Sequence, residues 1–259
     1  MECPLIGQRT RMVRLIFPVI LVGFILVPYL SWAEEKVTFA FFARGWPPFE
    51  MVVDGEPKGA AVDLFKALMP KDIDAVVEMM PAPRIFLKIQ GKPVFGRLTA
   101  KTWMGPEFNC LWSDPVITIN SVLYSSANKP VDYSGLESLK GLTIGCVKNY
   151  VYPEIEKLFK EDEAVRYDVN DDILLLRMVK AGRVDVAVFD DISAAWMVSK
   201  ASGMTAADFH VAKKLLGRVD LRFAFNRDES WKKRLPALNR TIRKRRVDGT
   251  IDEIMVRYK

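Results

Sequence analysis

Two adjacent carboxylates follow the most strand-like stretch of the chain. Residues 182–191 read Gly-Arg-Val-Asp-Val-Ala-Val-Phe-Asp-Asp, and the alternating valines predict a buried strand that ends at Asp190. In an open α/β sheet, ligands lie beyond the carboxyl ends of the strands. Asp190 is therefore placed to offer a bound solute a charge-assisted hydrogen bond. Alternatively, Asp190 and Asp191 cap a helix that begins near Ser193, and the two roles are compatible.

Aromatic side chains stand in the loop after the first predicted strand, residues 37–42. Trp46 and Phe49 flank two prolines in this loop. Their faces could enclose an apolar solute or bind a cation. Packing into the core of the fold is the alternative, and we expect at least one of the two to face a ligand-binding cleft.

A second candidate loop precedes a helix. Tyr150 and Tyr152 stand just before Pro153, a residue suited to the first turn of a helix. Free N–H groups at a helix N-terminus attract anions, so residues 148–150 could hold a carboxylate. The alternative is an ordinary exposed loop.

Length and charge limit the classes of protein to consider. With 259 residues, half of them hydrophobic, the chain can form one large domain or two small ones. The net charge is +6 with both signs mixed along the sequence, which disfavours a binder of polyanions. The basic run at 243–246 is more typical of a solvated helix face, and we expect no nucleic-acid partner.

The first residues have the pattern of a secretory signal peptide. Arginines at 9, 11 and 14 precede the apolar run 15–30, and Ser31-Trp32-Ala33 forms a small-residue cleavage site. We predict a signal peptide over residues 1–33. The alternative, an uncleaved anchor, is weakened because the run falls short of the roughly 20 residues of a spanning helix. Translation from Met12 is a further hypothesis.

Cysteine and histidine are scarce. Cys3 lies in the predicted signal peptide, and His210 is the single histidine. A zinc site or a Ser-His or Cys-His catalytic set is therefore not expected, nor is a cofactor. Cys110 and Cys146 could pair in an oxidising compartment, but we favour two buried free thiols.

The predicted elements repeat. A helix, a glycine and a strand follow one another at 84–98 and again at 174–190, which indicates two α/β lobes. Residues 116–124 form a strand long enough to cross between the lobes. The remaining predicted strands are 75–80, 142–147, 167–169, 209–215 and 221–225, with a hairpin at 51–58, and the remaining helices are 59–69, 153–161, 192–200 and 230–258, the last broken at 248–249.

In this order the segments resemble the periplasmic solute-binding proteins of amino-acid-type ABC transporters, the bacterial extracellular solute-binding protein family 3. The resemblance spans essentially the mature chain and rests on segments that are weak singly. They are Trp46-Pro47-Pro48-Phe49, Gly59 to Leu64, Trp112-Ser113-Asp114-Pro115-Val116, Leu139 to Gly145, Gly182 to Asp190, Asn226-Arg227-Asp228 and Asp248 to Ile254.

The resemblance implies a type II-like periplasmic-binding-protein fold, in which each lobe is a sheet flanked by helices and two hinge strands cross between the lobes. Lobe 1 would be discontinuous, 34–118 and 222–259, and lobe 2 would be 119–221. The protein would be a periplasmic monomer that captures a small polar, amino-acid-like solute and delivers it to a membrane permease. In such proteins the acid at the position of Asp190 commonly holds the ammonium group.

The sequence departs from the amino-acid binders at the opposite charge. Their carboxylate-clamping arginine would fall on Pro106, and no arginine occurs between Thr99 and Ser113. Thr99, Lys101 and Thr102 occupy the neighbourhood, and Lys101 or Arg84 could replace the charge, although lysine lacks the bidentate fork. The identity of the solute therefore stays open.

Two other functions share this scaffold. One is an enzyme, such as a dehydratase of a small cyclic acid, with Asp190, Glu50 or Glu107 as general acid or base. The other is a soluble ligand sensor. We expect a binding protein rather than an enzyme.

Overall fold

The computed structural model describes residues 35–258 except 72, 92–94 and 106, so the predicted signal peptide lies outside the described residues. The strands are β1 (Glu35–Phe42), β2 (Met51–Val53), β3 (Glu56–Lys58), β4 (Ile73–Met80), β5 (Phe95–Ala100), β6 (Leu111–Trp112), β7 (Ile117–Ser126), β8 (Thr143–Val147), β9 (Val165–Val169), β10 (Val186–Asp190), β11 (Phe209–Val211) and β12 (Gly217–Phe225). The helices are α1 (Ala60–Leu68), α2 (Ala82–Ile89), α3 (Glu156–Lys160), α4 (Asp172–Lys180), α5 (Asp191–Lys200), α6 (Glu229–Val247) and α7 (Thr250–Val256).

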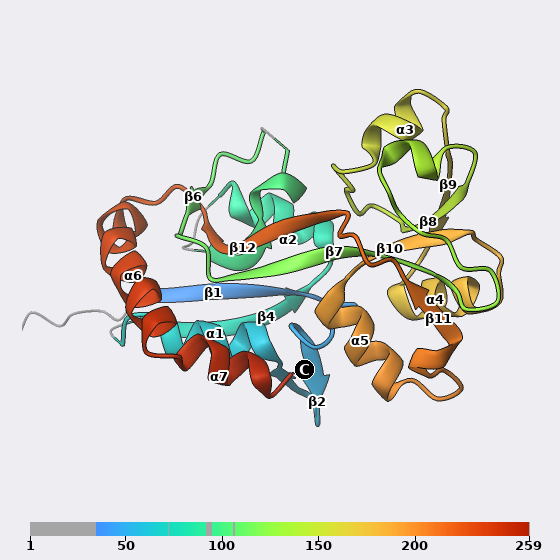
Figure 1. Ribbon diagram of the computed structural model, residues 1–259. Helices are drawn as coiled ribbons and strands as arrows, with labels where there is room; N and C mark the ends of the chain where they lie inside the picture. The colour runs from blue at the N-terminus through green and yellow to red at the C-terminus, as the bar shows by residue number, and fades with distance from the viewer. Residues whose placement is uncertain (1–34, 72, 92–94, 106, 259) are drawn as a thin grey trace, which may run out of the picture. The chain divides into compact units, whose positions relative to one another are not determined.

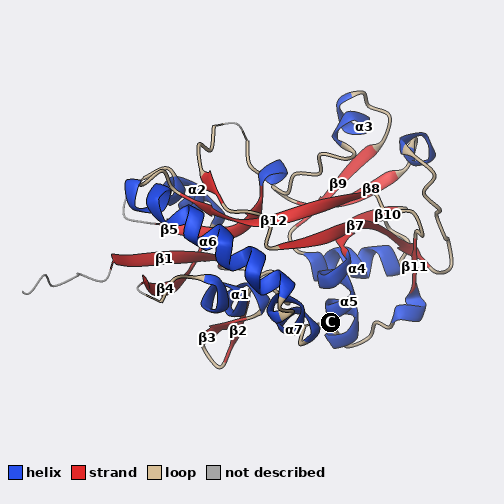
Figure 2. Ribbon diagram, turned by 60° about the vertical axis from the view of Figure 1, so that its left-hand side comes forward, coloured by secondary structure: helices blue, strands red, loops and turns tan. Residues whose placement is uncertain are grey.

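One mixed sheet runs through the described chain in the order β4-β1-β5-β12-β7-β10-β8-β9 (Figure 2). Its two ends are parallel, β4-β1-β5 and β10-β8-β9, and the antiparallel strands β12 and β7 join them. The first half of β7 pairs with β12, and its second half pairs with β10 and β11. These two strands therefore cross between the two halves, as Figure 1 shows.

Separate hydrophobic cores lie on the two sides of this crossing. We call lobe 1 the part built from β1–β6 with α1, α2, α6 and α7, and lobe 2 the part built from β8–β11 with α3, α4 and α5. The lobe 1 core includes Phe39, Phe65 and Trp231, and the lobe 2 core includes Leu175 and Phe189. Apolar residues at helical spacing form the buried face of α1, which packs against β1 as the sequence pattern predicts.

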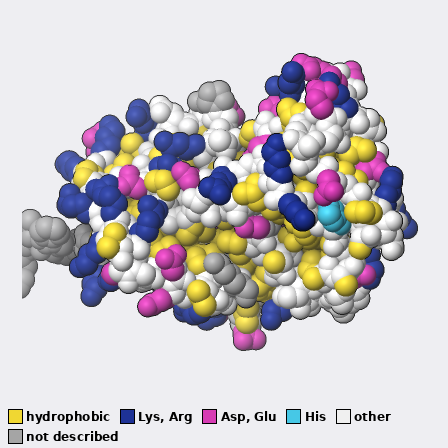
Figure 3. Space-filling view, viewed as in Figure 1, with side chains coloured by type: hydrophobic (Ala, Val, Ile, Leu, Met, Phe, Trp, Pro, Cys, Tyr) yellow, Lys and Arg dark blue, Asp and Glu magenta, His cyan; other side chains and the backbone are white. Residues whose placement is uncertain are grey.

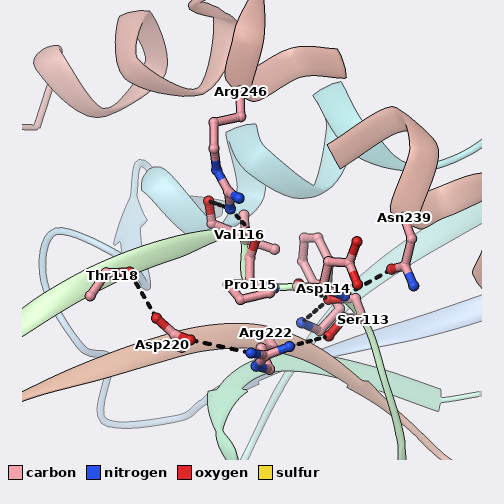
Figure 4. Close-up of polar contacts among 10 residues, drawn as sticks. Ser113, Asp114, Pro115, Val116, Thr118, Asp220, Arg222, Asn239 and Arg246 are labelled. Atoms are coloured by element: carbon pink, nitrogen blue, oxygen red, sulfur yellow. Dashed lines mark hydrogen bonds and ion pairs between the residues drawn. The ribbon is translucent and has the colours of Figure 1, made fainter. Parts of the chain in front are cut away.

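The predicted Ser-Asp-Pro segment joins the crossing strand to the C-terminal helix (Figure 4). Buried Ser113 accepts a hydrogen bond from the backbone N–H of Phe223 at 3.0 Å, and Asp114 N–H donates to Asn239 Oδ1 at 2.8 Å. Arg246 of α6 donates to the carbonyl oxygen of Pro115. Helix α6 is thus tied to the segment that leads into β7.

The basic run of α6 has a partly structural use. Figure 3 shows lysine and arginine side chains gathered at the left of the view, where α6 lies in Figure 1. Within the run, Arg243 pairs with Asp114, and Arg246 binds backbone oxygens of the neighbouring segment. The run is therefore not simply a solvated face.

Two predicted boundaries near the crossing were wrong. The strand predicted at 209–215 ends at Val211, and the strand predicted at 221–225 begins at Gly217. Pairing of residues 217–221 with β7 extends β12, and this long-range ladder leaves no local signal in the sequence.

Candidate functional site

The loop that carries Trp46 is fixed from both of its ends. Trp46 and Glu50 exchange backbone hydrogen bonds of 2.8 Å each, which closes the loop. The first N–H groups of α1 donate to the loop carbonyls of Pro48 and Phe49, at 2.9 and 3.0 Å. A side chain at Gly59 (φ 120°) would lie only 2.4 Å from the Phe49 oxygen, so glycine permits this close approach.

Trp46 faces lobe 2, and Phe49 lies behind it. The Trp46 Nε1–H donates to Asp190 Oδ2 at 3.0 Å, joining residues 144 positions apart. Phe49 is fully buried and packs on the Trp46 ring with centroids 4.3 Å apart. Of the two aromatic residues, Trp46 is therefore the one that points toward lobe 2.

Asp190 caps α5 and also reaches the cleft. Its Oδ1 accepts from the backbone N–H of Ser193 at 2.7 Å, which is the cap that the sequence suggested. Its Oδ2 faces Trp46. A carboxylate has about four lone-pair sites, so Asp190 can accept a further hydrogen bond from a solute.

A cavity of about 130 Å³ lies between the two lobes. By this measure it offers roughly ten times the space that one water needs. Most of its lining is aromatic or apolar, with a few charged and polar groups, the usual composition of a small-molecule site. The lining residues are Phe42, Trp46, Phe86, Arg97, Thr99, Trp103 and Met104 from lobe 1, Ile119 and Ser121 from β7, and Asn149, Tyr150, Val151, Tyr152, Glu154, Asp172, Val188, Phe189 and Asp190 from lobe 2.

The cavity gathers half of the predicted site residues. Trp46, Thr99, Tyr150 and Asp190 line it. Phe49 supports Trp46 from the core, whereas Arg84 is exposed on α2 and lies outside the lining. Lys101 and Thr102 are exposed in a short 3-10 helix, where Lys101 Nζ lies 5.8 Å from the ring centroid of Trp112.

Arg97 is a charged residue of the cavity that the sequence interpretation missed. It is 3% exposed, and its Nη2 lies 3.7 Å from Oε1 of the fully buried Glu50. The guanidinium carbon lies 4.0 Å from the ring centroid of Phe42. The sequence did contain a signal for Arg97. Residues two positions apart in a strand point to the same face, so Arg97 lies on the same face as Thr99, which was already a candidate.

Three carboxylates of lobe 2 line the cavity, those of Glu154, Asp172 and Asp190, and the sequence interpretation named Asp190 alone. Asp172 begins α4 and Glu154 accepts a hydrogen bond from Ser121 Oγ at 3.1 Å. Burial raises the pKa of the Asp172 carboxyl to about 7, helped by the charges of Asp190 and Asp171. Burial raises the pKa of Asp190 to about 6, against the hydrogen bonds from Ser193 and Trp46. Asp172 was not recognised, because an acid at the first position of a helix is common for structural reasons alone.

These raised pKa values give the unliganded protein a specific pH dependence. Folded Asp172 and Asp190 hold their protons more tightly than the unfolded chain, whose aspartates titrate near about 4. Their contribution to stability should therefore fall as pH rises from about 4 to about 7. Asparagine has no charge to bury. We therefore expect the free energy of unfolding of Asp172→Asn, relative to that of the wild type, to increase as pH rises from about 5 to about 8. Urea unfolding at both pH values measures this, and a constant difference between the proteins would contradict it.

The two cysteines of the described chain are free thiols, as the sequence interpretation favoured. Cys110 and Cys146 are free and buried, and burial raises the pKa of their thiols to about 11 and about 12. Within the described part of the chain, no group of three His, Cys, Asp or Glu side chains could hold a metal ion. The same residues include no helix long and apolar enough to cross a membrane.

Comparison with known proteins gives structural matches alone. No protein-family model matches the sequence, and neither does a curated protein. An ancestral arginine-binding protein bound to arginine is 18% identical with a TM-score of 0.65, over 86% of this chain and 98% of that one. A probable amino-acid ABC transporter extracellular-binding protein of Bacillus subtilis is 14% identical with a TM-score of 0.68, over 86% and 96% of the two chains.

A ligand-binding core is similar to the same extent. The GluR0 ligand-binding core in complex with L-glutamate is 13% identical with a TM-score of 0.67, over 88% of this chain and 99% of that one. The chain thus has the two-lobed α/β fold of the amino-acid ABC transporter substrate-binding proteins that are among its structural neighbours.

Proposed function

We propose that the protein captures a small amino-acid-like solute in the cavity between its lobes and delivers it to the permease of an ABC transporter. The observation that carries the proposal is the cavity itself, which residues of both lobes line and which the Trp46–Asp190 hydrogen bond bridges. A solute that binds between two lobes contacts both of them and thereby favours the closed arrangement. Such hinge closure around a ligand is a common motion of two-lobed proteins. Neighbours with this fold are bound to arginine or L-glutamate.

The ammonium group of the solute would lie against Asp190. Trp46 and Tyr150 would cover its apolar part, and Thr99 would offer a hydroxyl group from lobe 1. Aromatic rings around a carboxylate suit a cation, because both attract positive charge.

The wider setting follows from the same proposal. Residues 1–33 would be removed on export, and the mature protein would act in the periplasm as a monomer with a small-molecule solute and a permease as its partners. The lobes would divide at 34–118 with 222–259 and at 119–221. N-terminal sequencing of the exported protein tests the removal of residues 1–33. Its mass in solution tests whether it is a monomer.

Titration calorimetry tests the central claim. Purified protein is titrated with the common amino acids, polyamines, betaines and small aromatic acids, and we expect at least one of them to bind. Silence across the panel from folded protein would contradict a capture role. Turnover of a cyclohexadienyl acid, followed by absorbance, would instead favour an enzyme.

A conservative variant then tests the site. Asp190→Asn should weaken binding of an ammonium-bearing solute by roughly 10- to 100-fold, because a hydrogen bond to a charged group is lost. The variant should not lose stability, because asparagine also caps helices and carries no buried charge near neutral pH. Asp54→Asn in the exposed turn between β2 and β3 is the matched control. Equal affinity of Asp190→Asn and the wild type would remove Asp190 from the site.

A further inference from the structure

Arg97 is a buried cation with unused hydrogen-bond donors. It lies on β5, lines the cavity and is 3% exposed. Its Nε donates to the carbonyl oxygen of Leu98 at a long 3.4 Å. Among the contacts of the described residues, neither terminal nitrogen of its guanidinium donates a hydrogen bond. A guanidinium has five N–H donors and stays charged in proteins, so most of this capacity is unspent.

Glu50 balances the charge of Arg97 without saturating it. The 3.7 Å between Arg97 Nη2 and Glu50 Oε1 is too long for a hydrogen bond. Glu50 Oε1 is itself buried without a hydrogen-bond partner, while Oε2 accepts from the backbone N–H of Phe42 at 2.7 Å. Buried polar groups are rarely left in this state unless another group completes them. The Phe42 ring covers one face of the guanidinium, so its edge remains for a planar partner.

We propose that Arg97 receives the anionic group of the solute, a carboxylate or another planar oxyanion, and thereby supplies the positive charge that residues 99–113 lack as an arginine. The inference rests on the proposed solute-binding function. A guanidinium fork binds such groups through two parallel hydrogen bonds. Arg97 therefore decides whether the cavity prefers an acid to the corresponding amine.

The carboxylates of lobe 2 limit the chemical class of the solute further. Glu154, Asp172 and Asp190 line the cavity, and Arg97 is the cation among its lining residues. A second anionic group on the solute would meet like charges, which disfavours binding. The expected solute is thus a zwitterion with one carboxylate, one cationic group and an apolar body, rather than a dicarboxylate or a simple amine.

Pairs of probes that differ only in the carboxylate test this inference. L-phenylalanine is compared with phenethylamine, L-arginine with agmatine, and L-glutamate serves as the dicarboxylate, all by calorimetry on the mature protein. We expect the acid of a bound pair to bind roughly 10- to 100-fold tighter than its amine, and L-glutamate to bind most weakly of the acids. Arg97→Gln should remove the preference by weakening the acid and leaving the amine unchanged.

Further variants separate binding from folding. Glu50→Gln with Arg97→Gln removes both charges of the pair, so it keeps the test valid if the single variant is unstable. Glu50→Gln alone retains Arg97 and should keep the preference for the acid. Arg84→Gln, an exposed arginine of the same lobe, is the matched control and should behave as the wild type.

The outcomes distinguish this inference from the function on which it rests. Equal binding of acid and amine by the wild type, or an unchanged preference in the Arg97→Gln variants, would overturn the role of Arg97 and leave solute capture standing. Binding of no probe or panel member would overturn both.

Discussion

Replacing Arg97 by methionine should lower the free energy of unfolding of the unliganded protein by about 3–5 kcal/mol, measured by urea denaturation. The reason is Glu50, whose side chain is fully buried and whose nearest cation would be removed. Burial already raises the pKa of Glu50, with Arg97 opposing that shift. Without this cation, no opposite charge offsets the lost hydration of the buried carboxylate, so the folded state is destabilised.

The double variant Glu50→Gln/Arg97→Met is the internal control for this result. It has no buried charge at the pair, so it should be more stable than Arg97→Met alone although it carries one more substitution. The single variant should also recover stability as pH falls, since protonation of Glu50 removes the unpaired charge. Equal stability of the single and double variants would mean that the charge of Glu50 does not matter.

Replacing Trp231 by alanine should cost about 3–5 kcal/mol, the usual range for a buried aromatic side chain. Trp231 is fully buried at the start of α6 and stacks on Phe225 of β12 with ring centroids 3.6 Å apart. This contact fastens the returning C-terminal helix to the crossing strand. Thermal or urea unfolding of the unliganded protein measures the loss.

Trp231→Phe provides the comparison. The Trp231 Nε1–H is buried without a hydrogen-bond partner, so phenylalanine removes volume but breaks no hydrogen bond. We expect it to cost clearly less than alanine, because most of the ring contact with Phe225 is kept. If both variants were equally destabilised, the stacked ring would not be the source of the stability.

The local elements were largely predictable because their signals are local. The valines before Asp190 predicted a strand at 184–190, and β10 spans Val186–Asp190. The break predicted at 248–249 separates α6 from α7, and Gly249 takes the left-handed conformation (φ 81°) that such a break requires. Hydrophobic periodicity and turn residues act over a few positions, so one sequence suffices to detect them.

The candidate site was predictable mainly where it lies at the end of an element, and Thr99 inside β5 is the exception. Trp46 and Asp190 were named because they follow predicted strands, and Tyr150 because it precedes a predicted helix; all three line the cavity. Arg97 lies inside strand β5, two residues before the segment 99–113 in which the family's arginine is expected, and apart from the face it shares with Thr99 no local pattern marks it as a ligand-binding residue. Arg84 and Lys101 were named for that charge instead, and the structure places both outside the cavity lining.

The sequence by itself determined the two α/β halves, the crossing strand and the acid at the end of β10. Only the tertiary structure decided which side chains meet across the cavity. The Trp46–Asp190 hydrogen bond spans 144 residues, and Arg97 and Glu50 become partners because β5 and the loop after β1 lie side by side. Such meetings depend on how whole elements pack, because burial and charge pairing act through space rather than along the chain.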